Sequence, residues 1–119
     1  MTLQECYAML CGNYDEARSR LMSDSLIEKF VLKFPQDPTM QNLRDALSEE
    51  DYETAFRAAH TLKGVAANLA FSSLQEVASN LTEQLRAEKK KPDDALLEKV
   101  EEKYALVIEA IKNFQNARD

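Results

Sequence analysis

The sequence predicts an all-α fold: an antiparallel four-helix bundle with additional short helices at its N-terminus. In almost every segment the apolar residues recur about every 3.6 residues, and not every second residue as in strands. The chain has only two glycines and three prolines, so few positions interrupt a helix. The links that follow positions 69 and 88 are short, and short links make successive helices antiparallel.

Length and composition set the scale of this fold. The chain has 119 residues, of which 45% are hydrophobic and 30% charged, as in ordinary globular proteins. That length suffices for one sizeable core and not for two. We therefore expect residues 1–119 to form a single domain, and we expect a monomer.

Short helices are expected before the bundle. Thr2 and Glu5 form a capping-box pattern that opens a helix, and Gly12 ends it. A second helical stretch begins at Asn13 or Asp15. Its apolar positions are Ala17, Leu21, Met22, Leu26, Ile27, Phe30, Val31 and Phe34.

This second stretch is expected to break at residues 23–25. Ser25 and Glu28 form another capping-box pattern there. Pro35 and Pro38 then force a turn, because proline disfavours helical geometry in the residue before it.

Two helices of the bundle follow. Asp37 and Pro38 suit the cap and first position of a helix that fades near Ser48. Asp51 caps the next helix, which runs to about Leu69. The first of these helices turns inward Met40, Leu43, Ala46 and Leu47.

The last two helices have similar signals. Ser72 with Gln75 caps a helix that ends near Glu88, and the final helix begins near Pro92-Asp93. Their apolar positions are Leu74, Val77, Ala78, Leu81 and Leu85, then Leu97, Val100, Tyr104, Val107, Ile108, Ile111 and Phe114.

His60, the only histidine, lies at the edge of an apolar stripe on the helix from 51 to 69. Gly64 follows one turn later, although glycine inside a helix costs about 0.5–1 kcal/mol relative to alanine. The stripe comprises Tyr52, Ala55, Phe56, Ala59, Leu62, Ala66 and Leu69. The histidine face is bare beyond the ring, so a partner could lie flat on it. We expect partner docking at Glu53, Arg57, Gly64 and Ala67.

The residues around His60 suit phosphoryl transfer. An imidazole titrates near pH 6.5, so much of it is an uncharged nucleophile at neutral pH. Lys63, one turn away, can offset the charge of phosphoryl oxygens. The sequence has no glycine-rich phosphate loop, metal-binding cluster or Ser/His/Asp arrangement. It therefore predicts a phosphoryl carrier with no cofactor and no metal, and not an enzyme that takes a phosphoryl group from ATP.

Charge and cysteine content exclude other classes. The net charge of −6 disfavours nucleic-acid binding, and the one basic cluster, residues 89–91, suits a solvated loop. Cys6 and Cys11 lie about 140° apart on a helix and cannot easily share a metal, so we expect buried, reduced thiols. No apolar run approaches the ~20 residues of a membrane span, and no signal-peptide pattern is present. We therefore expect a cytoplasmic protein without membrane contact.

Residues 59–64, Ala-His-Thr-Leu-Lys-Gly, and the following 65–69, Val-Ala-Ala-Asn-Leu, resemble the signature of histidine-containing phosphotransfer (HPt) domains. The resemblance implies a four-helix bundle with an exposed, phosphorylatable histidine. Its partners would be a response-regulator receiver domain, through an aspartate, and a sensor histidine kinase. His60 would be the phosphorylation site, Lys63 would contact the phosphoryl oxygens, and Gly64 would leave room for the receiver.

Two positions depart from the family pattern. The family often has a glycine ten residues after the histidine, where this chain has Ala70. The turn should therefore differ, or the helix should end on Asn68. Some members carry a longer amide at the position of Thr82, which we expect to lie near His60, so another neighbour or water would orient the ring here.

Three alternatives stay open at this point. A lone histidine on a helix flank is commonly inert, and a mid-helix glycine commonly marks a close helix–helix contact. The chain could thus be an inert helical interaction module, a pseudo-HPt adaptor. It could also be the histidine-bearing domain of a chemotaxis-type kinase, although Thr61 stands where an acidic residue would favour that class. A metal or hydrolase role for His60 lacks a second ligand or base.

Overall fold

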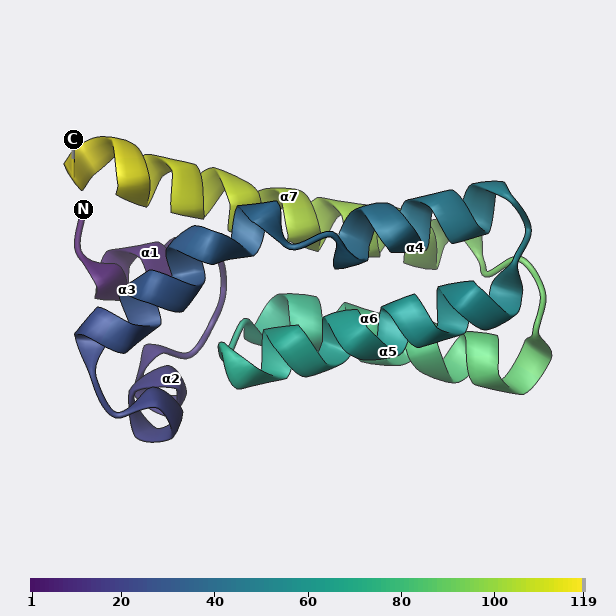
Figure 1. The fold of residues 1–119 in the computed structure, drawn as a ribbon, viewed down its shortest axis with the longest axis horizontal. Helices are drawn as coiled ribbons and strands as arrows, with labels where there is room; N and C mark the ends of the chain where they lie inside the picture. The colour runs from purple at the N-terminus through teal and green to yellow at the C-terminus, as the bar shows by residue number, and fades with distance from the viewer. Residues whose placement is uncertain (119) are drawn as a thin grey trace.

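The computed structural model describes residues 1–118, and within that range every regular element is a helix (Figure 1). The all-α prediction is therefore confirmed. The helices are α1 (Leu3–Met9), α2 (Tyr14–Leu21), α3 (Asp24–Lys33), the 3-10 turn η1 (Phe34–Gln36), α4 (Thr39–Ser48), α5 (Tyr52–Asn68), α6 (Ser72–Glu88) and α7 (Asp94–Arg118).

Helices α4 to α7 form the bundle, with each helix antiparallel to the one before it (Figure 1). Helix α5 packs against α4 on one side and α6 on the other, and α6 packs against α7. Helices α1, α2 and α3 lie at the end of the bundle where α5 ends and α6 begins (Figure 1). The 25-residue α7 extends past the other bundle helices to contact α1 and α3. The predicted bundle with additional short N-terminal helices is confirmed.

The N-caps of α1 and α2 are residues that the sequence predicts, whereas the N-cap of α3 is a different residue. The Thr2–Glu5 capping box opens α1, and the Asn13 side chain caps α2. The third cap was predicted at Ser25, and this was wrong: Ser23 is the N-cap, and its Oγ accepts from the Leu26 amide at 3.1 Å. Helix α3 begins at Asp24 because the chain already turns at residue 22, which has a left-handed backbone with φ 71°.

An aspartate caps α5, as predicted, whereas the predicted Asp37 cap of α4 was wrong. The N-cap position of α4 is Pro38 and the helix begins at Thr39, one residue later than expected, although the Asp37 carboxylate accepts from the Thr39 amide at 2.8 Å. The Asp51 carboxylate accepts from both the amide and the hydroxyl of Thr54, at 3.1 and 2.7 Å. These hydrogen bonds lower the pKa of Asp51, since they stabilise the charged carboxylate.

The predicted Ser72 cap of α6 was wrong. The N-cap position is Phe71, which makes no capping hydrogen bond, and Ser72 is the first residue of the helix. The Ser72 hydroxyl instead donates to the Ala70 carbonyl at 3.4 Å. Phe71 is fully buried, so apolar packing holds this end of α6.

Helix α5 ends at Asn68, one of the two outcomes expected from the alanine at position 70. Ala70 adopts the left-handed conformation with φ 56°, which an alanine disfavours. The Phe71 amide donates to the Ala66 carbonyl at 2.9 Å, which satisfies the end of the helix as in a Schellman motif. The Ala70 carbonyl accepts from the Asn13 amide at 2.9 Å, so this turn also ties the N-terminal helices to the bundle.

Three apolar residues of the α2–α3 segment are exposed, contrary to the inward positions that their periodicity predicts. Met22 is 76% exposed, Leu26 37% and Phe30 39%, whereas Ile27 and Val31 are buried. The short α2 and α3 lie at the end of the bundle, so only one side of each helix is covered (Figure 1).

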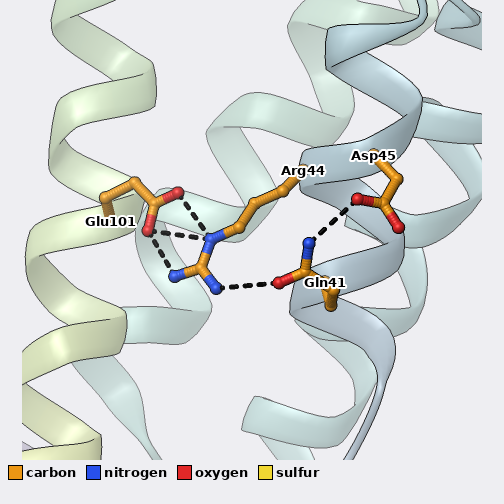
Figure 2. Close-up of polar contacts among 4 residues, drawn as sticks. All are labelled: Gln41, Arg44, Asp45 and Glu101. Atoms are coloured by element: carbon orange, nitrogen blue, oxygen red, sulfur yellow. Dashed lines mark hydrogen bonds and ion pairs between the residues drawn. The ribbon is translucent and has the colours of Figure 1, made fainter.

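An ion pair joins α4 and α7, the first and last helices of the bundle. Figure 2 shows Arg44 of α4 between Glu101 of α7 and Gln41, with Nη2 2.7 Å from Glu101 Oε1 and Nε 2.9 Å from Oε2. Gln41 in turn donates to Asp45 at 2.9 Å. The hydrogen bonds to Glu101 raise the pKa of Arg44. Both partners are partly exposed, so the pair adds little to stability.

The two cysteines differ in exposure, so the prediction of two buried thiols was wrong for Cys11. Cys6 is fully buried, its Sγ lies 3.6 Å from the Ala110 carbonyl oxygen, and burial raises its pKa to about 11. Cys11 is exposed, because it follows α1 in a left-handed turn with φ 60°.

We expect a thiol-specific disulfide reagent at pH 8 to modify Cys11 rapidly and Cys6 at least about 100-fold more slowly. The reason is that Cys6 has little thiolate and no access to solvent. Titration should therefore give one fast thiol in the native protein and two in denaturant. A Cys11→Ser variant serves as the control and should lose the fast phase. Two equally fast thiols in the native protein would contradict this assignment.

Candidate functional site

The candidate site lies on the outer face of α5, where the bundle leaves the helix uncovered. His60 and Gly64 are exposed, and Ala67 is partly buried. The prediction that His60 lies at the edge of the apolar stripe is correct. Tyr52 and Phe56 from that stripe are only partly buried. The buried residues of α5 are Ala55, Ala58, Ala59, Leu62 and Ala66.

The Phe56 ring lies next to His60, and an arginine of α6 packs on that ring. The Phe56 and His60 rings are stacked, with centroids 6.3 Å apart and planes 19° from parallel. The Arg86 guanidinium of α6 lies over the Phe56 ring, 5.2 Å from its centroid. Sequence reasoning missed Arg86, because the register of α6 against α5 is set by packing between helices. Among residues 1–118 the imidazole makes no hydrogen bond, so both ring nitrogens are available.

Thr82 does not orient the imidazole by a hydrogen bond. Its side chain is fully buried, and the hydroxyl donates to the Ala78 carbonyl of the same helix at 2.7 Å. The side chain that packs on the imidazole is instead Phe56, whose ring stacks on His60.

Two cations near His60 differ in their surroundings. Arg57 lies 3.8 Å from Glu53, and both side chains are well exposed, so this pair contributes little energy. Lys63 is partly buried and has no ion-pair partner in the described part of the chain. Since Lys63 is three residues after His60, its ammonium can reach a group bound to the imidazole.

The two glycines serve different purposes. A Cβ placed on Gly64 would have no neighbour within 4 Å, so no other helix within residues 1–118 requires a glycine there. A Cβ on Gly12 would lie 2.7 Å from the Ala70 carbonyl oxygen and 2.7 Å from Leu10 Cδ1. The close contact that often explains a glycine is thus found at Gly12 and not at Gly64.

We expect the same substitution to have opposite effects at these two positions. Gly64→Ala should stabilise the protein by about 0.5–1 kcal/mol, because it raises helix propensity without a clash. Gly12→Ala should destabilise it by about 1–3 kcal/mol, because backbone and core atoms must move. Urea unfolding followed by circular dichroism measures both free energies. A destabilised Gly64→Ala would contradict the open surface found at this position.

Charge is unevenly distributed around the bundle. Residues 54–75, which include nearly all of α5, contain no aspartate or glutamate, although the chain has 21 such residues. On α7, by contrast, a shallow depression is lined by four acidic residues, Asp94, Glu98, Glu101 and Glu102. The His60 face should therefore repel an anionic group less than the acidic depression on α7 does.

The described residues offer neither a metal site nor a membrane span. Within residues 1–118, no three His, Cys, Asp or Glu side chains are grouped so as to hold a metal ion. None of the described helices combines the length and the apolar character needed to span a membrane.

The family follows from comparison with known proteins. No curated protein and no solved structure matched the chain. The family model of the Hpt domain matches residues 25–117, which include α3 to α7 apart from their extreme ends and contain His60. Since this match covers most of the chain, the protein belongs to the Hpt domain family, whose members carry out histidine phosphotransfer in phosphorelays.

Proposed function

We propose that the protein is a phosphoryl carrier in which His60 accepts a phosphoryl group from a receiver-domain aspartate or a sensor histidine kinase and passes it to a receiver aspartate. One observation carries this proposal: the only imidazole of the chain is exposed on the same helix face as Gly64, one turn from Lys63, which has no ion-pair partner within residues 1–118. Glu53, Arg57 and Ala67 would complete the docking face.

The transfer step needs only that the imidazole be positioned to attack phosphorus and that a cation offset the charge of the phosphoryl oxygens. A ring nitrogen of His60 attacks phosphorus with its lone pair, a nitrogen–phosphorus bond forms, and the bond from phosphorus to the aspartyl oxygen breaks. The aspartate leaves as a carboxylate with that electron pair, and the second ring nitrogen keeps its proton. Lys63 would stabilise charge on the phosphoryl oxygens. The reverse reaction returns the group to a carboxylate.

The remaining features of the proposal concern the whole chain. We infer that residues 1–119 form one domain that acts as a cytoplasmic monomer and does not itself take a phosphoryl group from ATP. The match to a carrier family and the lack of a phosphate-binding loop in the sequence support the last of these points, that the chain takes no phosphoryl group from ATP itself.

Labelling tests the proposal directly. Receiver domains of the same organism, phosphorylated with labelled acetyl phosphate, are mixed with the protein and then separated from it. We expect at least one receiver to label the chain, with a bond that acid breaks and alkali spares, as a phosphoramidate requires. If phosphoramidate reagent labels the chain but no receiver or kinase does, the inert adaptor is favoured instead.

We expect Lys63→Ala to slow transfer from a phosphorylated receiver about tenfold or more, because a cation near the phosphoryl oxygens is lost. Arg57→Ala removes a cation from the docking face and is the comparison; it should slow transfer less than Lys63→Ala does, because Arg57 is given no contact with the phosphoryl group. Single-turnover rates, measured by quenched flow, compare the two variants. If both substitutions slowed transfer equally, Lys63 would act only through the positive charge of this face and not through contact with the phosphoryl oxygens.

A further inference from the structure

The direction of the His60 ring depends on packing, because the imidazole makes no hydrogen bond within residues 1–118. A side chain on a helix leans back over the preceding turn, so the imidazole can lie over Phe56 or over Arg57, four and three residues earlier. The structure places it on Phe56, with ring centroids 6.3 Å apart and planes 19° from parallel. Aromatic pairs are favourable at centroid distances of about 4.5–7 Å, so this contact favours one of the two directions.

The Phe56 ring is itself packed against a second helix. It is partly buried and lines a depression of about 260 Å³ between α5 and α6, together with Tyr52 and Leu85. The Arg86 guanidinium of α6 lies 5.2 Å from the centroid of the ring and 3.5 Å from Glu83 of its own helix. Because Phe56 touches α6 as well as α5, its ring has less freedom than a side chain that only water surrounds.

Two other neighbours of the imidazole offer no comparable support. The side chain of Thr82 is fully buried, and its hydroxyl donates to the Ala78 carbonyl at 2.7 Å. Arg57, the other residue that the imidazole could lie over, is well exposed and only 3.8 Å from Glu53. A flexible, exposed guanidinium provides no fixed surface, so Phe56 is the neighbour that can set the direction of the ring.

We propose that Phe56 is a positioning residue of the phosphoryl site, and that its ring, packed against α6, holds the imidazole in the direction from which it attacks phosphorus. This inference rests on the proposed function. A docked receiver fixes its phosphoryl group in space, and a misplacement of about 1 Å can cost about 100-fold in rate. A small donor in solution can approach the imidazole from any open side, so it does not depend on the held direction.

The test compares Phe56→Leu with Tyr52→Leu. Both remove a partly buried ring from the lining of the same depression, but Tyr52 is eight residues before His60, about 12 Å along the helix. Single-turnover transfer is measured at rising concentrations of a phosphorylated receiver that labels the wild type. Phe56→Leu should lower the saturated rate about fivefold and leave the half-saturating concentration within about twofold. Tyr52→Leu should leave both values within about twofold, and Phe56→Tyr, which keeps the ring, should restore the rate.

A second readout needs no receiver. Since His60 is the only histidine, its Hα–Hβ couplings in NMR spectra are readily assigned, and they report the populations of its side-chain rotamers. One rotamer should dominate in the wild type and in Tyr52→Leu, whereas Phe56→Leu should populate two. Labelling by phosphoramidate should stay within about twofold of the wild type in every variant.

The outcomes separate this role from docking and from the proposed function. Averaged rotamers in the wild type, or an unchanged saturated rate in Phe56→Leu, would overturn the positioning role alone. A change only in the half-saturating concentration would also overturn it, because Phe56 would then act in docking. So would an equal loss in Tyr52→Leu, which would indicate general packing. Failure of every receiver to label the wild type would overturn the proposed function and, with it, the role of Phe56.

Discussion

Replacing His60 with glutamine is expected to abolish labelling by phosphorylated receivers, by kinases and by phosphoramidate alike. The glutamine amide nitrogen has no available lone pair, so no nitrogen–phosphorus bond can form. Since His60 is the only histidine, no other imidazole can replace it. The loss should therefore be complete within the detection limit, and not a change of rate.

The fold should survive this change. His60 is exposed, and its imidazole makes no hydrogen bond to residues 1–118, so only the stacking on Phe56 is lost. We expect the free energy of unfolding to change by less than about 0.5 kcal/mol. Urea unfolding checks this, and binding of the unphosphorylated receiver should persist. A label that remains on His60→Gln would place the phosphoryl group on another residue and reject the proposed mechanism.

Gly64→Gln is expected to have the second largest effect, and it acts on docking. The new side chain would rise from the exposed face one turn from His60, where a Cβ would have no atom within 4 Å apart from its chain neighbours and the backbone of α5 itself. It would hold a receiver away from the imidazole. A displacement of about 1 Å can cost about 100-fold in rate, so we expect at least that loss in transfer from a receiver.

Two controls separate docking from chemistry and from folding. Labelling of Gly64→Gln by phosphoramidate should stay within about twofold of the wild type, because a small donor avoids the obstruction. Stability should rise by about 0.5 kcal/mol, since glutamine favours a helix more than glycine does. Gly64→Ala, with a much smaller side chain, should slow transfer less. Unchanged transfer to Gly64→Gln would reject the docking role of this face.

Local signals in the sequence were enough to predict most helices of the fold. The Thr2–Glu5 box and the Asp51 cap were correct, and Asn13 was one of the two starts that the sequence left open for α2, because a cap depends on hydrogen bonds among residues that are close in sequence. The cap of α3 was wrong because Ser23 and Ser25 offer the same chemistry. A left-handed residue 22 decides between them.

Part of the candidate site could likewise be predicted from the sequence and part could not. His60, Lys63 and Gly64 lie within five residues of one helix, so their common face follows from helical geometry alone. Arg86 over Phe56 could not be predicted in this way, because it depends on how far α6 slides along α5.

The sequence by itself therefore determined the helices, the antiparallel bundle and the position of His60 on an exposed flank, since each depends on helical periodicity and short links. Only the tertiary structure decided which apolar residues remain exposed. Met22, Leu26 and Phe30 repeat with the same period as buried residues, and nothing in that period says that α2 and α3 are covered on one side. Periodicity records which side of a helix is apolar, whereas burial depends on whether another helix packs there.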